Sequence, residues 1–420
     1  MKRYIFLTAN IHPIGGMQNY VAGKAVYLEK NGWKVTVFFW GDNKGTCAMT
    51  SMNKYLSGGM TELGMPPGEW PRRIREQVLN RMVRLIGAMD PADEIIVESQ
   101  DDVLALWGEL LAARLQAKHM CFICNETFRG PKKHYDQYLD FFNFKHKRRE
   151  LTCIHKESMG KLFAGYKGVE DKEAYYFEAA NEGPVQNVDN EKIDAIEKAD
   201  WNICCIGRSD KTCVDPIMDG IAGFALNYPQ KKIQLLIVGN VDDRMEWLHQ
   251  KLDQASNLIL TCLGDLVPIP RTLFSKIDVV IGSSGCAECS VVEGVPTIVS
   301  DAENSLANGI LGYTVFSAIF KNSQTVQLTY EQALKQVLID KIQDSLSFQW
   351  EANKPASYYY DQHMQFTAES EQSRQYDTDV CRQAHVDMGK LIKYYVRKYL
   401  PHMMSYYDSA KKKKGGKKEV

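Results

Sequence analysis

Short apolar runs alternate with amphipathic stretches along the first half of the chain. The apolar runs have the length of strands, and the stretches between them repeat apolar residues every three or four positions, as helices do. We expect, in chain order, a strand over 4–9, a helix over 17–30, strands over 35–40 and 94–97, a helix over 103–117 and a strand over 120–124. This alternation is typical of an α/β domain built on a parallel sheet.

The second half repeats this pattern after a polar and acidic stretch. We expect a strand over 202–206, a helix over 215–227, a strand over 233–238, a helix over 244–254 and strands over 258–262, 277–281 and 297–299. A length of 420 residues also favours two cores over one. The sequence therefore predicts two Rossmann-like domains, over 1–165 and 201–370, joined by a linker region over 166–200.

Four segments depart from this alternation. Residues 43–70 are rich in Gly, Met, Ser and Pro, and residues 132–149 are rich in Lys and Arg. We interpret both as irregular insertions where acceptor-binding loops would be useful. A C-terminal helix is expected within 371–400, and the tail over 401–420 is basic. The helical stretch from Asp379 places apolar side chains on one face, namely Met388, Leu391, Ile392, Tyr395 and Tyr399.

Charge and hydropathy exclude several classes of function. There are 51 basic and 52 acidic side chains, and a formal net charge of −1 argues against nucleic acid as the main partner. No run approaches the roughly 20 apolar residues of a membrane-spanning helix, and the run over 4–9 is too short for a signal peptide. We expect a cytoplasmic protein. The lysines of the tail allow a peripheral contact with the inner face of an anionic membrane.

Eleven cysteines are scattered through predicted strands, an odd number typical of reduced thiols. The pairs Cys121/Cys124 and Cys286/Cys289 raise the alternative of a zinc site. Residues three apart in a strand point to opposite faces, so Cys121 and Cys124 cannot share one ion. The triplet from Asp377 to Asp379 begins a predicted helix, and we interpret it as a cap. We expect no catalytic metal.

Paired glycines mark the first candidate site. Gly15 and Gly16 follow the first strand and precede a helix, so backbone N–H groups there can approach an anion such as a diphosphate. The Gly-x-Gly-x-x-Gly fingerprint of dinucleotide sites is absent. A purely structural turn remains the alternative.

The second candidate site follows the first strand of the second half. Ligands of open α/β sheets bind at the carboxyl ends of the strands, and Gly207, Arg208 and Lys211 lie at such an end. Arg208 can clamp phosphate oxygens and Lys211 can add a point charge, which together would neutralise a departing nucleoside diphosphate. The alternative is two surface cations on a loop.

The third candidate site lies within 281–299, which is interpreted as strand, Gly/Ser turn, short helix, turn and strand. Ser283, Ser284 and Gly285 open the short helix and offer hydroxyl and N–H groups to a phosphate or a sugar. Glu288 can accept hydrogen bonds from a ribose or sugar diol. Alternatively, it simply favours the helix N-terminus.

These motifs occur in an order that resembles the retaining GT-B glycosyltransferases of family four, also called group one. The resemblance covers roughly residues 3–320 and is carried by Gly15-Gly16, 32–35, Gly207-Arg208 with Lys211, 236–239, 263–264 and 294–298. It implies the GT-B fold, in which two Rossmann-like βαβ domains face each other across a cleft and a C-terminal helix packs back toward the N-terminal domain.

The resemblance also implies roles for single residues. Gly15, Gly16 and Gly207 would face the donor diphosphate, and Arg208 and Lys211 would hold it from the second domain. Backbone groups would contact the base at Gly264, Asp265 and Leu266.

The sugar-binding positions depart from the family pattern. Glu288 is the nearest match to the second Glu of a Glu-x7-Glu pair, with a slip of one residue, and Glu293 lies on the same donor side. The first Glu would fall at Val280 or Ile281, where none is present. Two further positions belong to the sugar and acceptor side: Asn125-Glu126, where the family usually has His-Asp, and His12.

The predicted function is a metal-independent glycosyltransferase, with no cofactor beyond a nucleotide-sugar donor and with a glycan or lipid-linked acceptor of surface polysaccharide synthesis. The missing first Glu leaves open a non-catalytic nucleotide-sugar-binding or partner subunit. A GT-B epimerase is a third alternative, but it would need carboxylates and histidines in the cleft, where the motifs offer only His12.

Overall fold

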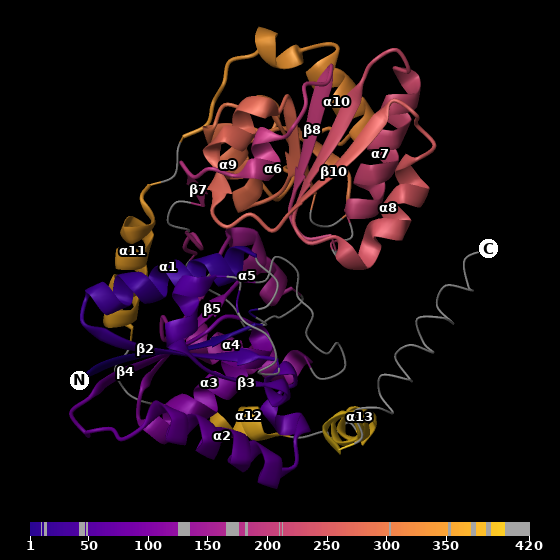
Figure 1. Ribbon diagram of the computed structural model, residues 1–420. Coiled ribbons are helices and arrows are strands. Elements are labelled where there is room, and N and C mark those ends of the chain that lie inside the picture. The colour runs from indigo at the N-terminus through magenta and orange to yellow at the C-terminus, as the bar shows by residue number, and fades with distance from the viewer. Residues whose placement is uncertain are drawn as a thin grey trace.

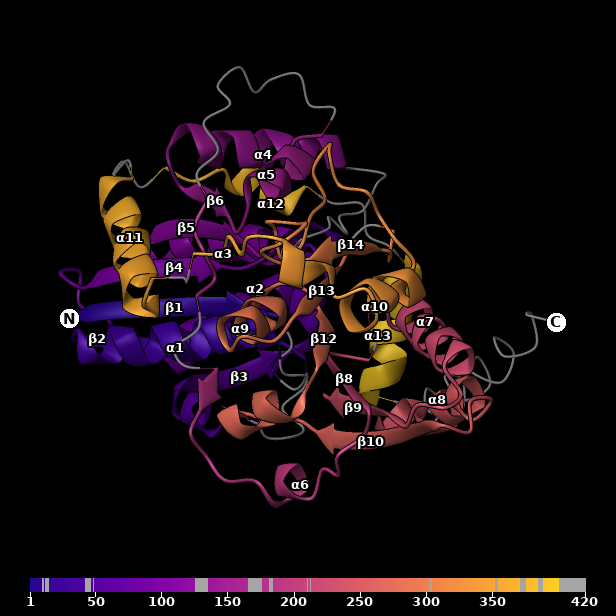
Figure 2. The ribbon, with the colours of Figure 1, turned by 90° about the horizontal axis from the view of Figure 1, so that it is seen from above.

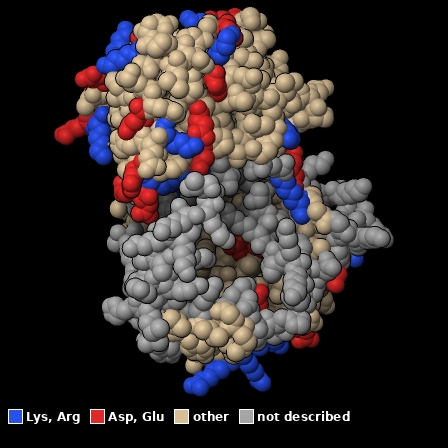
Figure 3. Space-filling view, turned by 90° about the vertical axis from the view of Figure 1, so that its right-hand side faces the viewer, with Lys and Arg blue, Asp and Glu red and all other residues tan. Residues whose placement is uncertain are grey.

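The computed structural model describes residues 1–9, 11, 15–41, 47, 49–124, 135–164, 176–180, 184–209, 211, 213–301, 304–351, 354–370, 375–383 and 388–399. Within these residues the chain forms two α/β domains, one above the other in Figure 1. Seen from the side in Figure 3, acidic and basic side chains are interspersed over the upper, C-terminal domain.

The N-terminal sheet has six parallel strands in the order β3-β2-β1-β4-β5-β6. Its strands are β1 (Lys2–Thr8), β2 (Trp33–Trp40), β3 (Leu56–Met60), β4 (Glu94–Ser99), β5 (Lys118–Ile123) and β6 (Leu151–Cys153). Its helices are α1 (Gly16–Lys30), α2 (Arg72–Ile86), α3 (Asp102–Leu115), α4 (Tyr135–Lys147) and α5 (Lys156–Leu162), with short 3-10 turns η1 (Thr50–Tyr55), η2 (Thr61–Gly64) and η3 (Pro67–Glu69).

The C-terminal sheet has the order β10-β9-β8-β12-β13-β14, and its last strand is antiparallel. Its strands are β8 (Trp201–Ile206), β9 (Ile233–Val238), β10 (Leu258–Gly264), β12 (Val279–Gly282), β13 (Thr297–Ser300) and β14 (Ala307–Ile310), and β7 (Val185–Gln186) pairs with β11 (Ile269–Pro270) beside it. The helices are α6 (Glu191–Asp194), α7 (Val214–Asn227), α8 (Met245–Leu252), α9 (Gly285–Val292) and α10 (Tyr330–Leu338), with turns η4 (Asp242–Arg244), η5 (Arg271–Lys276) and η6 (Ile342–Ser345).

The end of the chain returns to the N-terminal domain (Figures 1 and 2). Helix α11 (Ala356–Glu369) packs on α1, and α12 (Thr378–Arg382) packs on α3 and α4. Helix α13 (Met388–Tyr399) follows, and its Tyr394 ring lies 4.7 Å from the ring of Trp70. None of the described helices is long and apolar enough to span a bilayer.

Helices cover both faces of the N-terminal sheet, which explains why its strands are apolar runs without alternation. Along β1, Tyr4 and Phe6 point into the core shared with α1 and α11. Ile5 and Leu7 point into the core shared with α2 and α3. The pattern of a run buried on both sides was therefore sufficient to locate this strand.

The two predicted irregular insertions contain regular structure, so that expectation is wrong. Residues 56–60 form β3 at the edge of the sheet, where two glycines dilute the apolar pattern. Residues 135–147 form α4, whose Phe141, Phe142 and Lys145 are buried at helical spacing. The basic side chains of this segment are partly internal and do not all face an acceptor.

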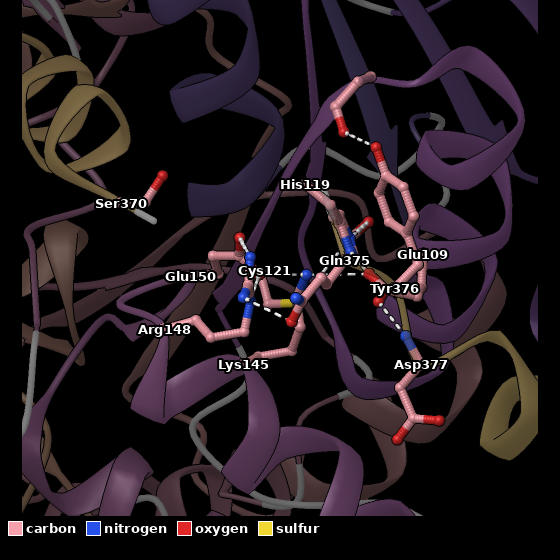
Figure 4. Close-up of polar contacts among 12 residues, drawn as sticks. Glu109, His119, Cys121, Lys145, Arg148, Glu150, Ser370, Gln375, Tyr376 and Asp377 are labelled. Carbon is pink, nitrogen blue, oxygen red and sulfur yellow. Dashed lines mark hydrogen bonds and ion pairs between the residues drawn. The ribbon is translucent and has the colours of Figure 1, made fainter. Parts of the chain in front are cut away.

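Figure 4 shows where these internal cations lie. Lys145 Nζ is 2.9 Å from Glu109 Oε2 and 2.7 Å from Glu150 Oε2, and His119 Nδ1 is 2.6 Å from Glu109 Oε2. Burial alone would raise the pKa of Glu109, but the charge of Lys145 and the hydrogen bond from His119 lower it to about 2. The Asp377 N–H donates to Glu109 Oε1 at 2.9 Å, so this cluster also anchors α12.

The predicted single helix from Asp379 is interrupted, which is a second correction. Helix α12 ends at Arg382, and Gln383 is extended with φ −60° and ψ 126°. Gln383 packs closely against η3 at this point, since a Cβ on Gly68 would stand 1.9 Å from the Gln383 carbonyl oxygen. The predicted apolar face is also divided, because Leu391 is buried whereas Met388 and Ile392 are exposed.

Candidate functional site

Both sheets have a topological switch point, the place where consecutive strands leave in opposite directions. It lies between β1 and β4 in the first sheet and between β8 and β12 in the second. Open α/β sheets bind ligands outside the carboxyl ends of their strands at this point. The loops after these four strands are therefore the parts of the molecule in which to look for a site.

The loop after β8 begins at Gly207, whose N–H donates to the Val238 carbonyl at 3.0 Å. Its φ of 148° lies in the region that favours glycine. A Cβ on Gly239 would stand 2.1 Å from the Gly207 carbonyl oxygen. Two glycines therefore let the ends of β8 and β9 lie against each other, which fixes where the next residues point.

Arg208, Lys211 and Ser283 come together just beyond the point where the ends of β8 and β9 meet. All three are half-buried and, together with Gly207, line a narrow pocket of about 50 Å³. Lys211 Nζ lies 3.2 Å from Ser283 Oγ, which joins the loop after β8 to the loop after β12 across the switch point. The structure thus brings together the predicted cations and one predicted serine.

A third cation of this pocket, Arg244, was not predicted. Its guanidinium stacks 3.7 Å from the ring centroid of Trp247, and Nη1 donates to the Ser209 carbonyl at 2.5 Å. Nη2 pairs with Asp215 Oδ1 at 2.6 Å. Arg244 directly precedes α8. Its sequence context gave no sign of a site, but it holds the loop that carries Arg208.

The turn after β12 is strained. Ser284 has φ 58° and ψ −144°, a backbone conformation that residues other than glycine rarely adopt. Its N–H donates to the Ala318 carbonyl at 2.7 Å, and its own carbonyl accepts from Glu288 N at 3.1 Å. Gly285 then begins α9. Such strain at a strand-to-helix turn is common where backbone groups face a ligand.

The two predicted glutamates lie outside the lining of this pocket. Glu288 is in the first turn of α9, and its charge contributes, after burial, to raising the pKa of Tyr359 on α11. Glu293 follows the C-terminus of α9 and pairs with Arg271, with Nε and Oε2 3.0 Å apart. Glu293 is therefore engaged in an ion pair.

The predicted base-contacting residues lie on a neighbouring loop. Gly264 ends β10 with φ 75°, and its carbonyl accepts from Gly239 N at 2.9 Å. Asp265 is exposed and Leu266 is half-buried. They are not part of the pocket lining, but the Gly239 contact ties their loop to the one that carries Arg208.

On the N-terminal side, Gly15 precedes the first turn of α1 and Gly16 begins it, as predicted. Among the described residues, no atom lies within 4 Å of where a Cβ on Gly16 would stand. His12, Asn125 and Glu126 lie outside the described residues.

Sequence reasoning missed three polar residues at the carboxyl edge of the N-terminal sheet, namely Thr8, Gln100 and Asp101. Asp101 precedes α3, and its Oδ1 accepts from Leu104 N at 2.6 Å. Burial and, second, the charge of Asp102 raise the pKa of Asp101 to about 7. Their position in the chain was the available signal. Thr8 ends β1, and Gln100 and Asp101 follow β4, just as Arg208 follows β8.

The segment 316–320 joins the two sides of the site. Ala318 accepts the hydrogen bond from Ser284, and the Phe320 ring lies 5.8 Å from the ring of His155. Lys161 Nζ lies 4.4 Å from the centroid of the same ring. His155 directly follows β6 and precedes α5, so the carboxyl edge of the N-terminal sheet faces the turn that carries Ser283.

The residues considered for metals have other roles. Cys121 lies in the core with α3, whereas Cys124 packs on the core with α1, so the two point to opposite faces as predicted. Asp377 Oδ1 caps α12 by accepting from Val380 N, which confirms the predicted cap. Among the described residues, no three His, Cys, Asp or Glu side chains are grouped to hold an ion.

A larger cavity, of about 340 Å³, lies at the opposite end of the N-terminal sheet. It is lined by the starts of β1, β2, β4 and β5 and by α11. Amino ends of parallel strands are not where such sheets bind ligands. We therefore place the site at the carboxyl edges.

Three solved structures are similar to the whole chain. Anabaena Alr3699/HepE in complex with UDP and glucose is 12% identical with a TM-score of 0.54, covering 93% of this chain and 99% of that chain. A glycosyltransferase from Rickettsia africae is 12% identical with a TM-score of 0.52, covering 94% and 98%. Sucrose-phosphate synthase from Thermosynechococcus elongatus is 13% identical with a TM-score of 0.50, covering 95% and 100%.

No protein-family model matches the sequence, and no curated protein matches it significantly. At such low identity the structural similarity shows the fold alone. That fold is GT-B, with two Rossmann-like domains and a chain end that returns to the first of them. The predicted fold class is confirmed.

Proposed function

We propose that the protein is a glycosyltransferase that moves a sugar from a nucleoside-diphosphate sugar to a glycan or lipid-linked acceptor in surface polysaccharide synthesis. The observation that carries the proposal is the convergence of Arg208, Lys211 and Ser283 at the switch point of the second sheet. Two cations and a hydroxyl at this place match the charge and the hydrogen-bonding needs of a diphosphate.

Charge stabilisation is the main catalytic contribution of these residues. As the bond between the sugar and the diphosphate breaks, negative charge grows on the leaving phosphate oxygen. Arg208 and Lys211 stabilise that charge from fixed positions, since Arg244 holds the loop between them. In this proposal the two cations supply the positive charge that a metal ion supplies in other transferases.

The stereochemical course is the part of the proposal that the sequence resemblance supports least. Retention was implied by a pair of glutamates, and the first position falls at Val280 or Ile281. Both are buried in β12, Val280 in one core and Ile281 in the other, and neither offers a carboxylate, although Ile281 also lines the pocket. This observation favours, as second candidate, a nucleotide-sugar-binding subunit that lacks turnover.

The cellular setting of the proposed enzyme is the cytoplasm, with peripheral contact at an anionic membrane. Met388, Ile392 and Tyr395 of α13 are exposed at positions four and three apart, and the chain continues into the lysine-rich tail. Apolar side chains beside lysines suit the boundary between lipid chains and anionic head groups.

A binding and turnover assay on Arg208→Ala tests the proposed site. Thermal stability with UDP, GDP, ADP, dTDP and CMP identifies the nucleotide, because a ligand at 100 times its Kd stabilises by about 2.7 kcal/mol. Loss of a charged hydrogen bond of ~1.5–3 kcal/mol should weaken binding about ten- to hundredfold. The exposed Arg73 of α2 provides the control Arg73→Ala.

If Arg208→Ala binds the nucleotide as well as Arg73→Ala does, the site is misplaced. Nucleotide binding without any release of sugar from the matching donor would favour the non-catalytic subunit. No stabilisation by any of the five nucleotides would contradict both candidates.

A further inference from the structure

Asp101 occupies a particular place in the N-terminal sheet. It follows β4 directly beside the end of β1, at the switch point of that sheet. Register fixes this placement, since Leu7 pairs with Ser99 and the Gln100 N–H donates to the Leu7 carbonyl at 3.1 Å. Asp101 is half-buried.

Two polar atoms beside Asp101 point to a ligand. Thr8 Oγ1 and Gln100 Oε1 belong to fully buried side chains, and neither has a hydrogen-bond partner among the described residues. Thr8 and Gln100 are neighbours across β1 and β4 at the same edge. An unpaired buried polar atom costs about 1–3 kcal/mol, so two of them at one edge indicate a partner that arrives with the substrate.

The same edge faces the donor side. The contact of Phe320 with His155 and the hydrogen bond between Ala318 and Ser284 connect the carboxyl edge of the first sheet to the turn after β12. A hydroxyl compound held by Thr8 and Gln100 would therefore enter from the side opposite to Arg208 and Lys211. An acceptor entering from that side can attack from behind the leaving group.

We propose that Asp101 is the general base that activates the acceptor hydroxyl, so that transfer inverts the anomeric carbon. This inference rests on the proposed glycosyltransferase function and adds the proton acceptor and the stereochemical course. Thr8 and Gln100 are positioning residues that orient the acceptor hydroxyl toward the Asp101 carboxylate.

The step balances without a further reactant. The acceptor oxygen forms a bond to the anomeric carbon while its proton passes to the Asp101 carboxylate. The bond between the anomeric carbon and the phosphate oxygen breaks, and its electron pair leaves with the nucleoside diphosphate, next to Arg208 and Lys211. Asp101 then releases the proton to water.

The surroundings of Asp101 suit proton transfer near neutral pH. Burial and the charge of Asp102 raise the pKa of Asp101 to about 7, although the N–H groups at the start of α3 act in the opposite direction. Among the described residues, a further titratable neighbour is the Cys124 thiol just after β5, and burial raises its pKa well above the usual value, so it is neutral. A carboxyl group with a pKa in this range is a stronger base than an exposed aspartate.

Asp101→Asn is the direct test, because asparagine caps helices as well as aspartate does and the fold should be kept. Asp377→Asn is the matched control, since Asp377 caps α12 in the same way. The probe is the donor whose nucleotide stabilises the protein, for example UDP-glucose, with water as acceptor. Proton NMR identifies the first anomer released, before it equilibrates.

We expect the wild type and Asp377→Asn to release the inverted anomer. Asp101→Asn should lose about 10²–10⁴-fold in kcat with unchanged nucleotide binding. The rate of the wild type should fall as pH drops through about 7. Asp102→Asn should move this fall to lower pH, because removing the neighbouring negative charge lowers the pKa of Asp101.

A retained anomer, or an Asp101→Asn variant within twofold of the wild type, would overturn the inference while the transferase function stands. An unmoved pH profile in Asp102→Asn would also count against it. Absence of turnover in the wild type with every donor removes the proposed function itself, and the inference falls with it.

Discussion

Lys24 is a fully buried cation whose partners come from both ends of the chain. Its Nζ lies 2.5 Å from Glu98 Oε2, 2.9 Å from the Tyr20 hydroxyl and 3.4 Å from His363 Nδ1. Tyr4 also donates to Glu98. A buried pair of this kind contributes little net stability, but removing one partner leaves an uncompensated charge. The cluster therefore determines where α11 sits on α1.

The pH dependence of stability should reflect His363. Burial and, second, the charge of Lys24 lower its pKa well below the usual value. The unfolded chain then binds a proton at a higher pH than the native state does, so this residue makes stability fall as pH drops below about 6.5. The expected loss is about 1.4 kcal/mol per pH unit for one histidine.

Urea unfolding at pH 7.0, 6.0 and 5.0 measures this effect as the difference between the wild type and His363→Gln. The slope should be shallower in the variant by the contribution of one histidine. His119, which is buried with a lowered pKa, keeps its own contribution in both proteins. Equal slopes would mean that the pKa of His363 is not lowered in the native state.

Sequence reasoning at the residue scale worked where chemistry followed a strand directly. Arg208, Lys211 and Ser283 stood after predicted strands, and the structure brings them to one pocket. Gln100 and Asp101 also directly follow a strand. From the sequence, however, Asp101 before a helix could not be told apart from an ordinary helix cap. What a cap also faces depends on strand order, which the sequence pattern does not contain.

Helices α7 and α10 pack closely, and one glycine sets how closely. A Cβ on Gly220 would stand 2.6 Å from the Cβ of Tyr330 and 3.0 Å from the backbone N of Glu331. A Cβ on Gly223, one turn later in α7, would meet first the Oε2 of Glu331 at 2.8 Å, the end of a flexible side chain. The two positions therefore differ in whether the neighbour can move.

Gly220→Ala should destabilise the protein by about 1–3 kcal/mol, the usual cost of overpacking. Gly223→Ala should be neutral or stabilising, because alanine restricts the unfolded chain and favours the helix. Thermal unfolding of the two variants side by side provides the measurement. Equal destabilisation would show that the helix pair cannot adapt at either site.

Elements without a clear hydrophobic period were those that the sequence could not locate. Strand β3 is short, lies at an edge and contains Gly58 and Gly59, so tertiary pairing with β2 decides its structure. Helix α4 carries the buried Lys145 among phenylalanines. From the sequence this lysine looks like part of a basic surface, because its partners Glu109 and Glu150 are known only from the structure. Long runs buried on both sides were located correctly.

The two domains of the molecule are built differently along the chain, one from a single segment and the other from two. Residues 184–351 contain every strand of the C-terminal sheet and the helices that cover it. The N-terminal domain instead combines residues 1–180 with α11 and α12, which supply His363 to the Lys24 cluster and the Asp377 N–H to Glu109. One domain is continuous in sequence and the other is not.

A fragment of residues 184–351 should therefore fold alone and unfold cooperatively, whereas a fragment of residues 1–180 should not. The second fragment leaves one face of α1 uncovered and lacks the Asp377 N–H that donates to Glu109. Circular dichroism and urea unfolding of each fragment test this difference. A stable, cooperative 1–180 fragment would show that the returning helices are not needed for that core.

The two-domain plan followed from the strand and helix alternation, but the return of the chain end was implied only by resemblance. A helix over 356–369 was not predicted from the sequence, and the pattern of these residues does not show which domain such a helix covers. Buried His363 gave no sequence signal, because a single histidine on an apolar face is equally compatible with either domain.

The divided N-terminal domain has a consequence during synthesis on the ribosome. Its last buried residue, Leu391, is added just over 200 residues after residue 180. At about 5–20 residues per second, roughly 10–40 s pass between these two points. The domain made first should therefore be completed last, after the C-terminal domain has folded. In this interval the bare face of α1 is a natural binding site for a chaperone.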